Sequence, residues 1–138
     1  MRKFFIISVF FILLAGCSNS MTAKEAIEKN YEHYNNKNFA AYFDMQSERL
    51  QEEMVKTTKM SREELILGWK KSWIPAEVIK IETESGGTDE GTIVTATIHY
   101  PSTLLSPETT TKTTFELIKE NGEWKVDEIL KTETLAMQ

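Results

Sequence analysis

The spacing of apolar residues changes at Pro75, and this change restricts the fold more than any other feature of the sequence. Before Pro75, apolar residues recur three or four positions apart, as on one face of a helix. After it, they alternate with polar residues, as in a strand. Because the residue before a proline disfavours the α region, Pro75 is expected to end the helical half. The sequence therefore predicts the α+β class, with N-terminal helices packed on an antiparallel sheet.

The helical half contains its own start signals. Thr22 with Glu25, and Ser61 with Glu64, have the spacing of capping boxes. The first helix is expected to end near Lys37. Asn38 and Ser47 can cap two further helices, and the residues expected to face the core are Ile27, Tyr31, Tyr34, Phe39, Tyr42, Phe43, Leu50, Met54, Leu65, Ile66, Trp69 and Trp73. Trp69, Trp73 and Trp124 are expected to close the core between helices and sheet.

Four strands are expected in the second half, over 77–85, 92–100, 109–120 and 123–132. In the first of them, Val78 should face one side and Ile79 and Ile81 the other. A turn containing Gly86 and Gly87 follows it. Asn121-Gly122 fits a type I′ hairpin, in which both central residues need φ > 0. Ile129 breaks the alternation, which predicts a bulge near an exposed Asp127. Consecutive hairpin links predict a four-stranded antiparallel meander.

The first residues form a separate pattern. Arg2 and Lys3 precede an apolar run from Phe4 to Ala15, which as a helix is too short to cross a bilayer of roughly 30 Å. This order is typical of a secretory signal peptide. Leu14-Ala15-Gly16-Cys17 resembles the lipobox of bacterial lipoproteins, which implies a lipid on Cys17 and cleavage before it. The alternatives are an ordinary signal peptide with an incidental cysteine, or a hydrophobic first helix.

The resulting organisation is a signal peptide over 1–16, the lipidated Cys17 with a short tether over 17–21, and a single domain over 22–138. The tether reaches roughly 15 Å. The expected location is the extracytoplasmic face of a bacterial cell membrane, with a Gram-positive cell favoured and the outer membrane expected if the cell is Gram-negative. Cys17 is the only cysteine, so a lipid there excludes disulfides. Removing Arg2 and Lys3 would change the net charge from −5 to −7, which disfavours nucleic-acid binding.

The segments "YNNKNFAAYFDMQSERLQEEM", "MSREELILGWKKSW" and "FELIKENGEWKVDEI" together resemble the small nuclear-transport-factor-2-like (cystatin-like) lipoproteins of bacteria. The resemblance covers nearly all of 22–132. It implies a strongly curved sheet whose hollow holds the helices, a cone-like shape, and a ligand pocket between helix and sheet. The group of lipoproteins that the chain resembles also includes domain families without an assigned function.

The residues that would line such a pocket are mostly aromatic. They are Tyr31, Tyr42, Trp69, Trp73, His99, Tyr100, Phe115 and Trp124. Buried Tyr and Trp need partners for their polar atoms, which a small pocket can provide. The simpler interpretation is that these rings form the core. His99 lies one residue away from the apolar face of its strand, where it would face either solvent or a cavity.

No motif in the chain indicates catalysis. His33 and His99 are far apart, and no metal or cofactor is expected. Asp44 is placed at the rim of the aromatic stripe. We therefore expect a non-enzymatic binding or interaction module of the cell envelope, which contacts the membrane through Cys17 and binds an envelope protein or a small apolar or peptide ligand. The alternatives are a pocket enzyme of the isomerase or dehydratase type, with His99 or an acid as base, and a structural accessory subunit of an envelope complex.

Overall fold

The computed structural model describes residues 21–83 and 91–136. These residues form helices followed by strands, which confirms the α+β class. The helices are α1 (Ala23–Asn35), α2 (Phe39–Asp44), α3 (Glu48–Thr58) and α4 (Arg62–Lys71). The strands are β1 (Glu77–Thr83), β2 (Gly91–Tyr100), β3 (Thr109–Glu120) and β4 (Glu123–Leu135). The predictions for the signal peptide, for Cys17 and for the turn at Gly86-Gly87 lie outside the described residues.

Each helix begins where its capping residue predicts. The four N-caps are Thr22, Asn38, Ser47 and Ser61. Two of them form complete capping boxes. The backbone N–H of Glu25 donates to Thr22 Oγ1 (3.2 Å), and the N–H of Thr22 donates back to Glu25 Oε2 (2.8 Å). Ser61 and Glu64 repeat this exchange. Local sequence therefore determines the helix starts before any tertiary contact forms.

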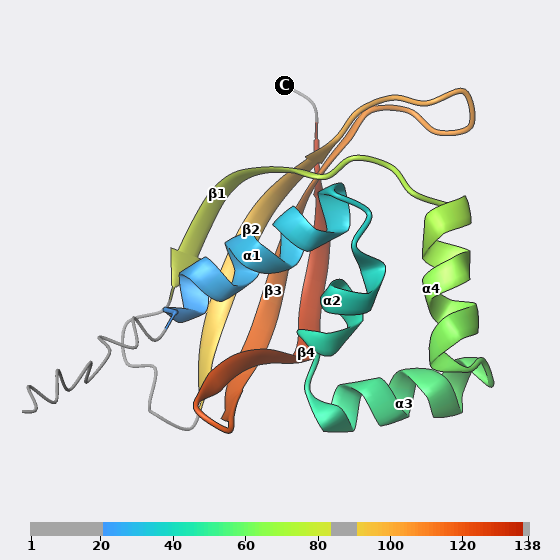
Figure 1. The fold of residues 1–138 in the computed structure, drawn as a ribbon. Coiled ribbons are helices and arrows are strands. Elements are labelled where there is room, and N and C mark those ends of the chain that lie inside the picture. Colours follow the sequence, from blue (N-terminus) through green and yellow to red (C-terminus); the bar gives the residue numbers. More distant parts are fainter. Residues whose placement is uncertain (1–20, 84–90, 137–138) are drawn as a thin grey trace, which may run out of the picture.

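The sheet is the predicted antiparallel meander, in the order β1-β2-β3-β4. The β3–β4 hairpin turns at Asn121 and Gly122, whose φ angles of 53° and 79° match the predicted type I′ geometry. Figure 1 shows α1 crossing the strands, α3 leading away from the end of β4, and α4 farther out beyond α2. None of the helices in the described ranges covers the face of the sheet opposite α1.

Bulges interrupt both edge strands. In β1 the register shifts between Val78 and Lys80, so Val78 and Ile81 pair with Ile98 and Ala96 and share a face. Ile79 is left 57% exposed. The predicted alternation of Val78 against Ile81 is therefore wrong, because a strict period of two does not include the extra residue of a bulge.

The bulge predicted near Asp127 in β4 is confirmed. Val126 pairs with Leu117 and Glu128 pairs with Glu116, which leaves Asp127 as the extra residue. A second shift follows at Leu130. Bulges bend a strand and increase its twist, so β4 turns away from a flat sheet along its length.

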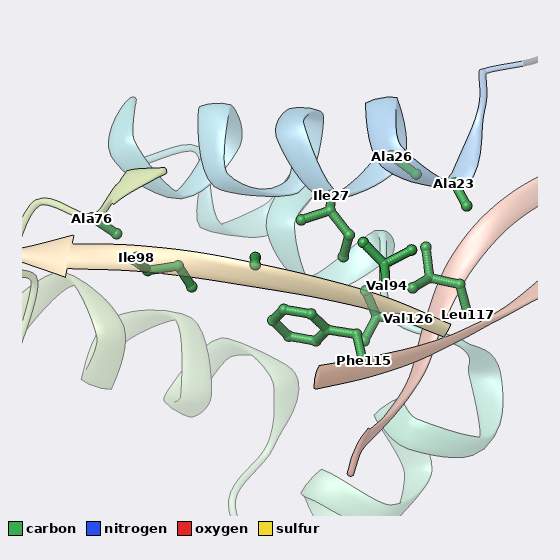
Figure 2. Packing of buried hydrophobic residues seen from close by; sticks show 10 residues of the cluster. Ala23, Ala26, Ile27, Ala76, Val94, Ile98, Phe115, Leu117 and Val126 are labelled. Carbon is green, nitrogen blue, oxygen red and sulfur yellow. The ribbon is translucent and has the colours of Figure 1, made fainter. Parts of the chain in front are cut away.

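The core lies between α1 and the inner face of the sheet (Figure 2). Its central residues are Ile27 of α1, Val94, Ala96 and Ile98 of β2, Phe115 and Leu117 of β3, and Val126 of β4. Ala23 and Ala26 face the sheet from α1, and these small side chains let the helix approach closely. Burial alternates along β2 and β3, so each of these strands has one face toward the core.

The arm, which we define as α3 and α4 (residues 48–71), contributes little to this core. α3 has no buried residue, and Leu65 is the buried residue of α4. α2 connects the two parts, since its Phe39 and Phe43 are buried. Phe39 and Phe43 also face the Trp69 ring of α4 at 6.3 and 6.1 Å between centroids.

The prediction for the three tryptophans holds in part: Trp124 packs against the core and Trp69 packs on the buried Phe39 and Phe43, whereas Trp73 does not lie on its helix. Trp69, Trp73 and Trp124 are each half-buried. α4 ends at Lys71, where the N–H of Ser72 donates to Gly68 O, so Trp73 lies beyond the helix and not on its inner stripe. The indole N–H of Trp73 donates instead to Tyr34 O of α1 (3.0 Å).

Candidate functional site

A pocket of about 320 Å³ opens where the arm meets the sheet. Its wall combines α2, α3, α4 and β4, and we call it the Tyr42–Trp69 pocket. The lining residues are Tyr42, Gln46, Leu50, Glu53, Met54, Trp69, Glu128 and Ile129. Apolar side chains dominate this set, with a few polar groups at its border, which is the usual composition of a small-molecule site.

The aromatic side of the pocket is built from rings that pack on one another. The rings of Tyr42 and Trp69 meet edge to face with their centroids 5.1 Å apart. Phe39 and Phe43 back the Trp69 ring from the buried side. Edge-to-face ring pairs are favourable beyond the area that they bury. Two pocket rings are thus positioned before any ligand arrives.

The polar border carries two carboxylates and an amide. Glu53 and Glu128 lie at the pocket from α3 and β4. Arg49 Nη1 lies 2.8 Å from Glu53 Oε2 and neutralises part of this charge. The Gln46 side chain donates to Tyr42 O (3.1 Å). Most of the lining is apolar and its two exposed charged groups are negative, so it suits a ligand with an apolar body and a positive group.

A polar lock fixes the start of α3 against β4. Ser47 Oγ donates to Asp127 Oδ1 (2.6 Å), and Arg49 Nε donates to the same oxygen (3.1 Å). The backbone of Val126 exchanges two hydrogen bonds with Met45 and Ser47. The prediction that Asp127 is exposed is therefore wrong: its side chain is 15% exposed, because the bulge turns it toward α3.

This lock also shifts the acidity of Asp127. Burial raises the pKa of its carboxyl group, but the hydrogen bonds from Ser47 and Arg49 and the charge of Arg49 outweigh burial. The pKa of Asp127 therefore lies below its ordinary value of 3.8. A carboxylate held ionised by two donors is suited to positioning α3 and not to accepting a proton near neutral pH.

The tyrosines of the chain, Tyr31, Tyr34, Tyr42 and Tyr100, gather between α1, α2 and β2. The rings of Tyr34 and Tyr42 are 5.5 Å apart, and Tyr31 shares a hydrogen bond with Tyr100. Burial, with neighbouring hydroxyls, raises the pKa of Tyr42 to about 12 and that of Tyr31 further. The phenols of Tyr31 and Tyr42 therefore stay neutral at physiological pH and can donate hydrogen bonds.

The structure divides the eight predicted pocket residues among several places. Tyr42 and Trp69 line the Tyr42–Trp69 pocket. Tyr31 packs edge to face on the core residue Phe115, at 6.3 Å between ring centroids (Figure 2 shows Phe115). Tyr100 packs beside this core and bonds Tyr31.

The other three predicted residues lie elsewhere. Lys37 Nζ lies 4.3 Å from the ring centroid of Trp73, and Lys119 Nζ lies 5.0 Å from the ring centroid of Trp124. His99 lies on the face of β2 opposite Ile98. Its ring nitrogens contact Glu108 (3.0 Å) and Thr110 (3.1 Å).

Sequence reasoning missed much of the actual wall. Leu50 and Met54 had the one-turn spacing of a buried stripe, and both were assigned to the core. Ile129 was noticed only as a break in alternation. Nothing in the local sequence shows that α3 stands beside β4, because that placement depends on the Ser47–Asp127 contact between distant segments.

The proposed acid–base residues are not at the pocket. Asp44 is exposed, and its carboxylate pairs with Arg62 Nη2 at 3.2 Å. Within residues 21–83 and 91–136, no group of three His, Cys, Asp or Glu side chains could hold a metal ion. None of the helices in these ranges combines the length and apolar composition that a membrane-crossing helix needs. No protein-family model matches the chain, and no curated protein matches it.

Proposed function

We propose that this chain is an extracytoplasmic lipoprotein, anchored to a bacterial cell membrane by lipid on Cys17, whose domain is a non-enzymatic binding module of the cell envelope. The observation that carries the binding role is the Tyr42–Trp69 pocket, with its preformed aromatic side and its carboxylate border. The lipobox resemblance at Leu14 to Cys17 carries the location.

We also propose that the domain has the cone-like, nuclear-transport-factor-2-like arrangement. Three features support this proposal: helices precede the strands, they cover one face of a meander, and bulges bend both edge strands. In such an arrangement the hollow side of the sheet is the place for a ligand, and the pocket lies at the border of that side, next to β4.

The proposed ligand is a small molecule or peptide segment with an apolar body and a cationic group. Tyr42, Leu50 and Trp69 would contact the apolar part. Glu53 and Glu128 would attract the cation, and Arg49 satisfies only one of the two directly. A non-enzymatic role agrees with the position of His99 on the other face of the sheet.

A pair of surfactants with the same chain and opposite charge tests the site. Dodecyltrimethylammonium, below its micelle concentration, should bind a chain starting at Ser18 more tightly than dodecyl sulfate, as measured by calorimetry. Leu50→Trp should fill the pocket and weaken binding about tenfold or more. Leu67→Trp, at an exposed position of α4, is the matched control. If the folded Leu50→Trp protein binds dodecyltrimethylammonium as tightly as the parent chain, the pocket is not the binding site.

Glu53→Gln with Glu128→Gln tests the charge separately from the shape. This double variant should lose the preference for the cation and keep the apolar contribution. If the double variant keeps the full preference for the cation, the cationic group binds at another site.

The anchor has its own test. Cys17→Ser removes the acyl acceptor, so the mature protein should leave the membrane fraction or accumulate uncut. Radiolabelled lipid on the Cys17→Ser protein would contradict the anchor.

The enzyme alternative is tested by His99→Gln and Asp44→Asn in a deletion strain. Each should complement at matched protein level, and failure of either would favour the enzyme.

A further inference from the structure

Two adjacent leucines stand in full contact with water at the loop between β2 and β3. Leu104 and Leu105 have exposed fractions of 105% and 99%, the highest of any large hydrophobic residue in the described ranges. The next most exposed large hydrophobic residues are Ile79, Ile129 and Leu67, and all three are less than 60% exposed. Figure 1 shows this loop projecting beyond the end of the sheet. Isolated exposed leucines are common on proteins, but a fully exposed pair at a projecting tip is not.

The turn that carries the leucines bonds three of its own backbone N–H groups. Thr103 Oγ1 accepts from the N–H groups of Leu105 (3.2 Å) and Ser106 (3.0 Å). The N–H of Thr103 donates to Ser106 O (2.8 Å), and the two hydroxyls share a further contact. The leucines are therefore presented by a tight turn in which the N–H groups of Thr103, Leu105 and Ser106 are bonded internally. Bonded donors lower the cost of bringing this turn into the interfacial layer of a bilayer.

The loop also carries no charge. Residues 101–107 contain only proline, serine, threonine and leucine. Glu108 follows, and its carboxylate is held by His99 Nε2 at 3.0 Å. No charge has to be dehydrated when the tip of this loop leaves water.

We infer that the Leu104–Leu105 loop inserts into the interfacial layer of the lipid bilayer, as a second attachment point beside the lipid on Cys17. This inference rests on the proposed membrane anchor. A bilayer fits these observations better than a protein groove. A protein groove would have a complementary shape and polar groups at its rim that form hydrogen bonds with the occupant. The N–H groups of Thr103, Leu105 and Ser106 are already bonded within the turn and cannot donate to such a rim. Insertion into the bilayer interface needs no such donors.

The start of α1, which follows the proposed tether, and the Leu104–Leu105 loop lie at opposite ends of the sheet. Asn35, the last residue of α1, bonds the backbone of Ala76, which precedes β1 at the end of the sheet where Glu77 pairs with His99. Figure 2 shows Ala76 beside Ile98, and Ala23 near Val94 and Leu117 at the other end. Since β2 has ten residues, these ends are separated by roughly 30 Å. Insertion of the loop therefore predicts that the strands lie along the membrane surface.

A tethered, labelled protein tests the inference without depending on natural lipidation. The buried residues of the described ranges lie between Ala23 and Val126, so a chain starting at Ser18 keeps all of them, and it contains no cysteine. A hexahistidine segment before Ser18 would hold it on phosphatidylcholine vesicles that contain a nickel-chelating lipid. Leu105→Cys then accepts an environment-sensitive fluorophore, and Leu67→Cys gives the matched control on α4.

On vesicles, emission from position 105 should shift to the blue and be quenched by brominated phosphatidylcholine, while position 67 should not change. With little chelating lipid, the unlabelled Leu104→Ser/Leu105→Ser protein should bind at least about tenfold more weakly than the parent, and Leu67→Ser should bind equally. A label at 105 that stays in water on the vesicle overturns the inference. A blue shift that rises with protein concentration without vesicles also overturns it, in favour of self-association. Because the chelating lipid replaces Cys17, neither result depends on the anchor.

Discussion

The sheet with α1 and the arm of α3 and α4 are held by different kinds of interaction. Aliphatic side chains with 0% exposure, such as Ile27, Val94 and Leu117, join α1 to the strands. The arm has almost no buried aliphatic residue and is held by ring contacts at Trp69 and by the polar lock at Asp127. Burial of apolar area supplies most folding free energy, so the sheet should set global stability while the arm sets the shape of the pocket.

This difference explains why the pocket lies where it does. A helix that buries a full apolar stripe fills the space beneath it. α3 does not, and Leu50 and Met54 reach only partial burial, so a hollow remains against Ile129 of β4. Regions held by few apolar contacts also open at lower free energy than the core. The arm is therefore both the wall of the candidate site and the part most able to adjust to a ligand.

The largest expected effect is in the sheet. Leu117→Ala removes a fully buried side chain at the centre of β3, and such changes cost about 2–5 kcal/mol. We expect the melting temperature of the 18–138 chain to fall by roughly 10 °C or more, measured by circular dichroism. Leu67→Ala, on the exposed side of α4, is the control and should change little. A small effect of Leu117→Ala would show that the sheet does not dominate stability.

Trp69→Ala should have a smaller and more local effect. The half-buried ring joins Tyr42, Phe39 and Phe43, so its loss should cost about 3 kcal/mol or less, below the value for a fully buried tryptophan. Hydrogen exchange should accelerate in α3 and α4 and stay nearly unchanged in β2 and β3 after correction for global stability. Equal loss of protection in both regions would mean that arm and sheet unfold as one unit.

The lock at Asp127 should make the arm sensitive to acid. The folded pKa of Asp127 is below 3.8, so its contribution is present above that pH and disappears as pH falls through the folded value. Asp127→Asn should lower stability by about 1–2 kcal/mol at pH 7, as for loss of hydrogen bonds to a charged group. The melting temperature of this variant should then vary less than that of the parent between pH 7 and pH 3.

The matched control for this pH series is Glu133→Gln. Lys131 also lowers the pKa of Glu133, but that pair lies in solvent on β4. Its loss should leave the melting curve unchanged at every pH. An acid response that survives Asp127→Asn would assign it to other carboxylates.

Local signals predicted the fold well, and long-range contacts explain what they missed. Caps such as Thr22 and Ser61, and the turn at Asn121-Gly122, act within a few residues, so the sequence shows them directly. The bulge at Asp127 was visible because it broke a period. The burial of Asp127 was not visible, because the residues that bond to its side chain, Ser47 and Arg49, lie 80 and 78 positions away in the sequence. The same limit applies to the site: the aromatic residues were identified, but which of them meet in one pocket depends on where the arm stands.

The smallest expected effect concerns a polar residue inside the stronger region. Asn30 of α1 is 3% exposed, and within the described residues its Nδ2 has no hydrogen-bond partner. An unsatisfied buried donor costs about 1–3 kcal/mol, and an apolar side chain of similar size removes that cost. Asn30→Leu should therefore leave stability unchanged or raise it by about 1 kcal/mol, as measured by urea unfolding. Asn35→Leu, in the same helix, should do the opposite, because Asn35 bonds both backbone groups of the buried Ala76. If Asn30→Leu destabilises the protein as much as Asn35→Leu, the Asn30 amide has a partner in solution, and the core under α1 is less purely aliphatic than the comparison with the arm implies.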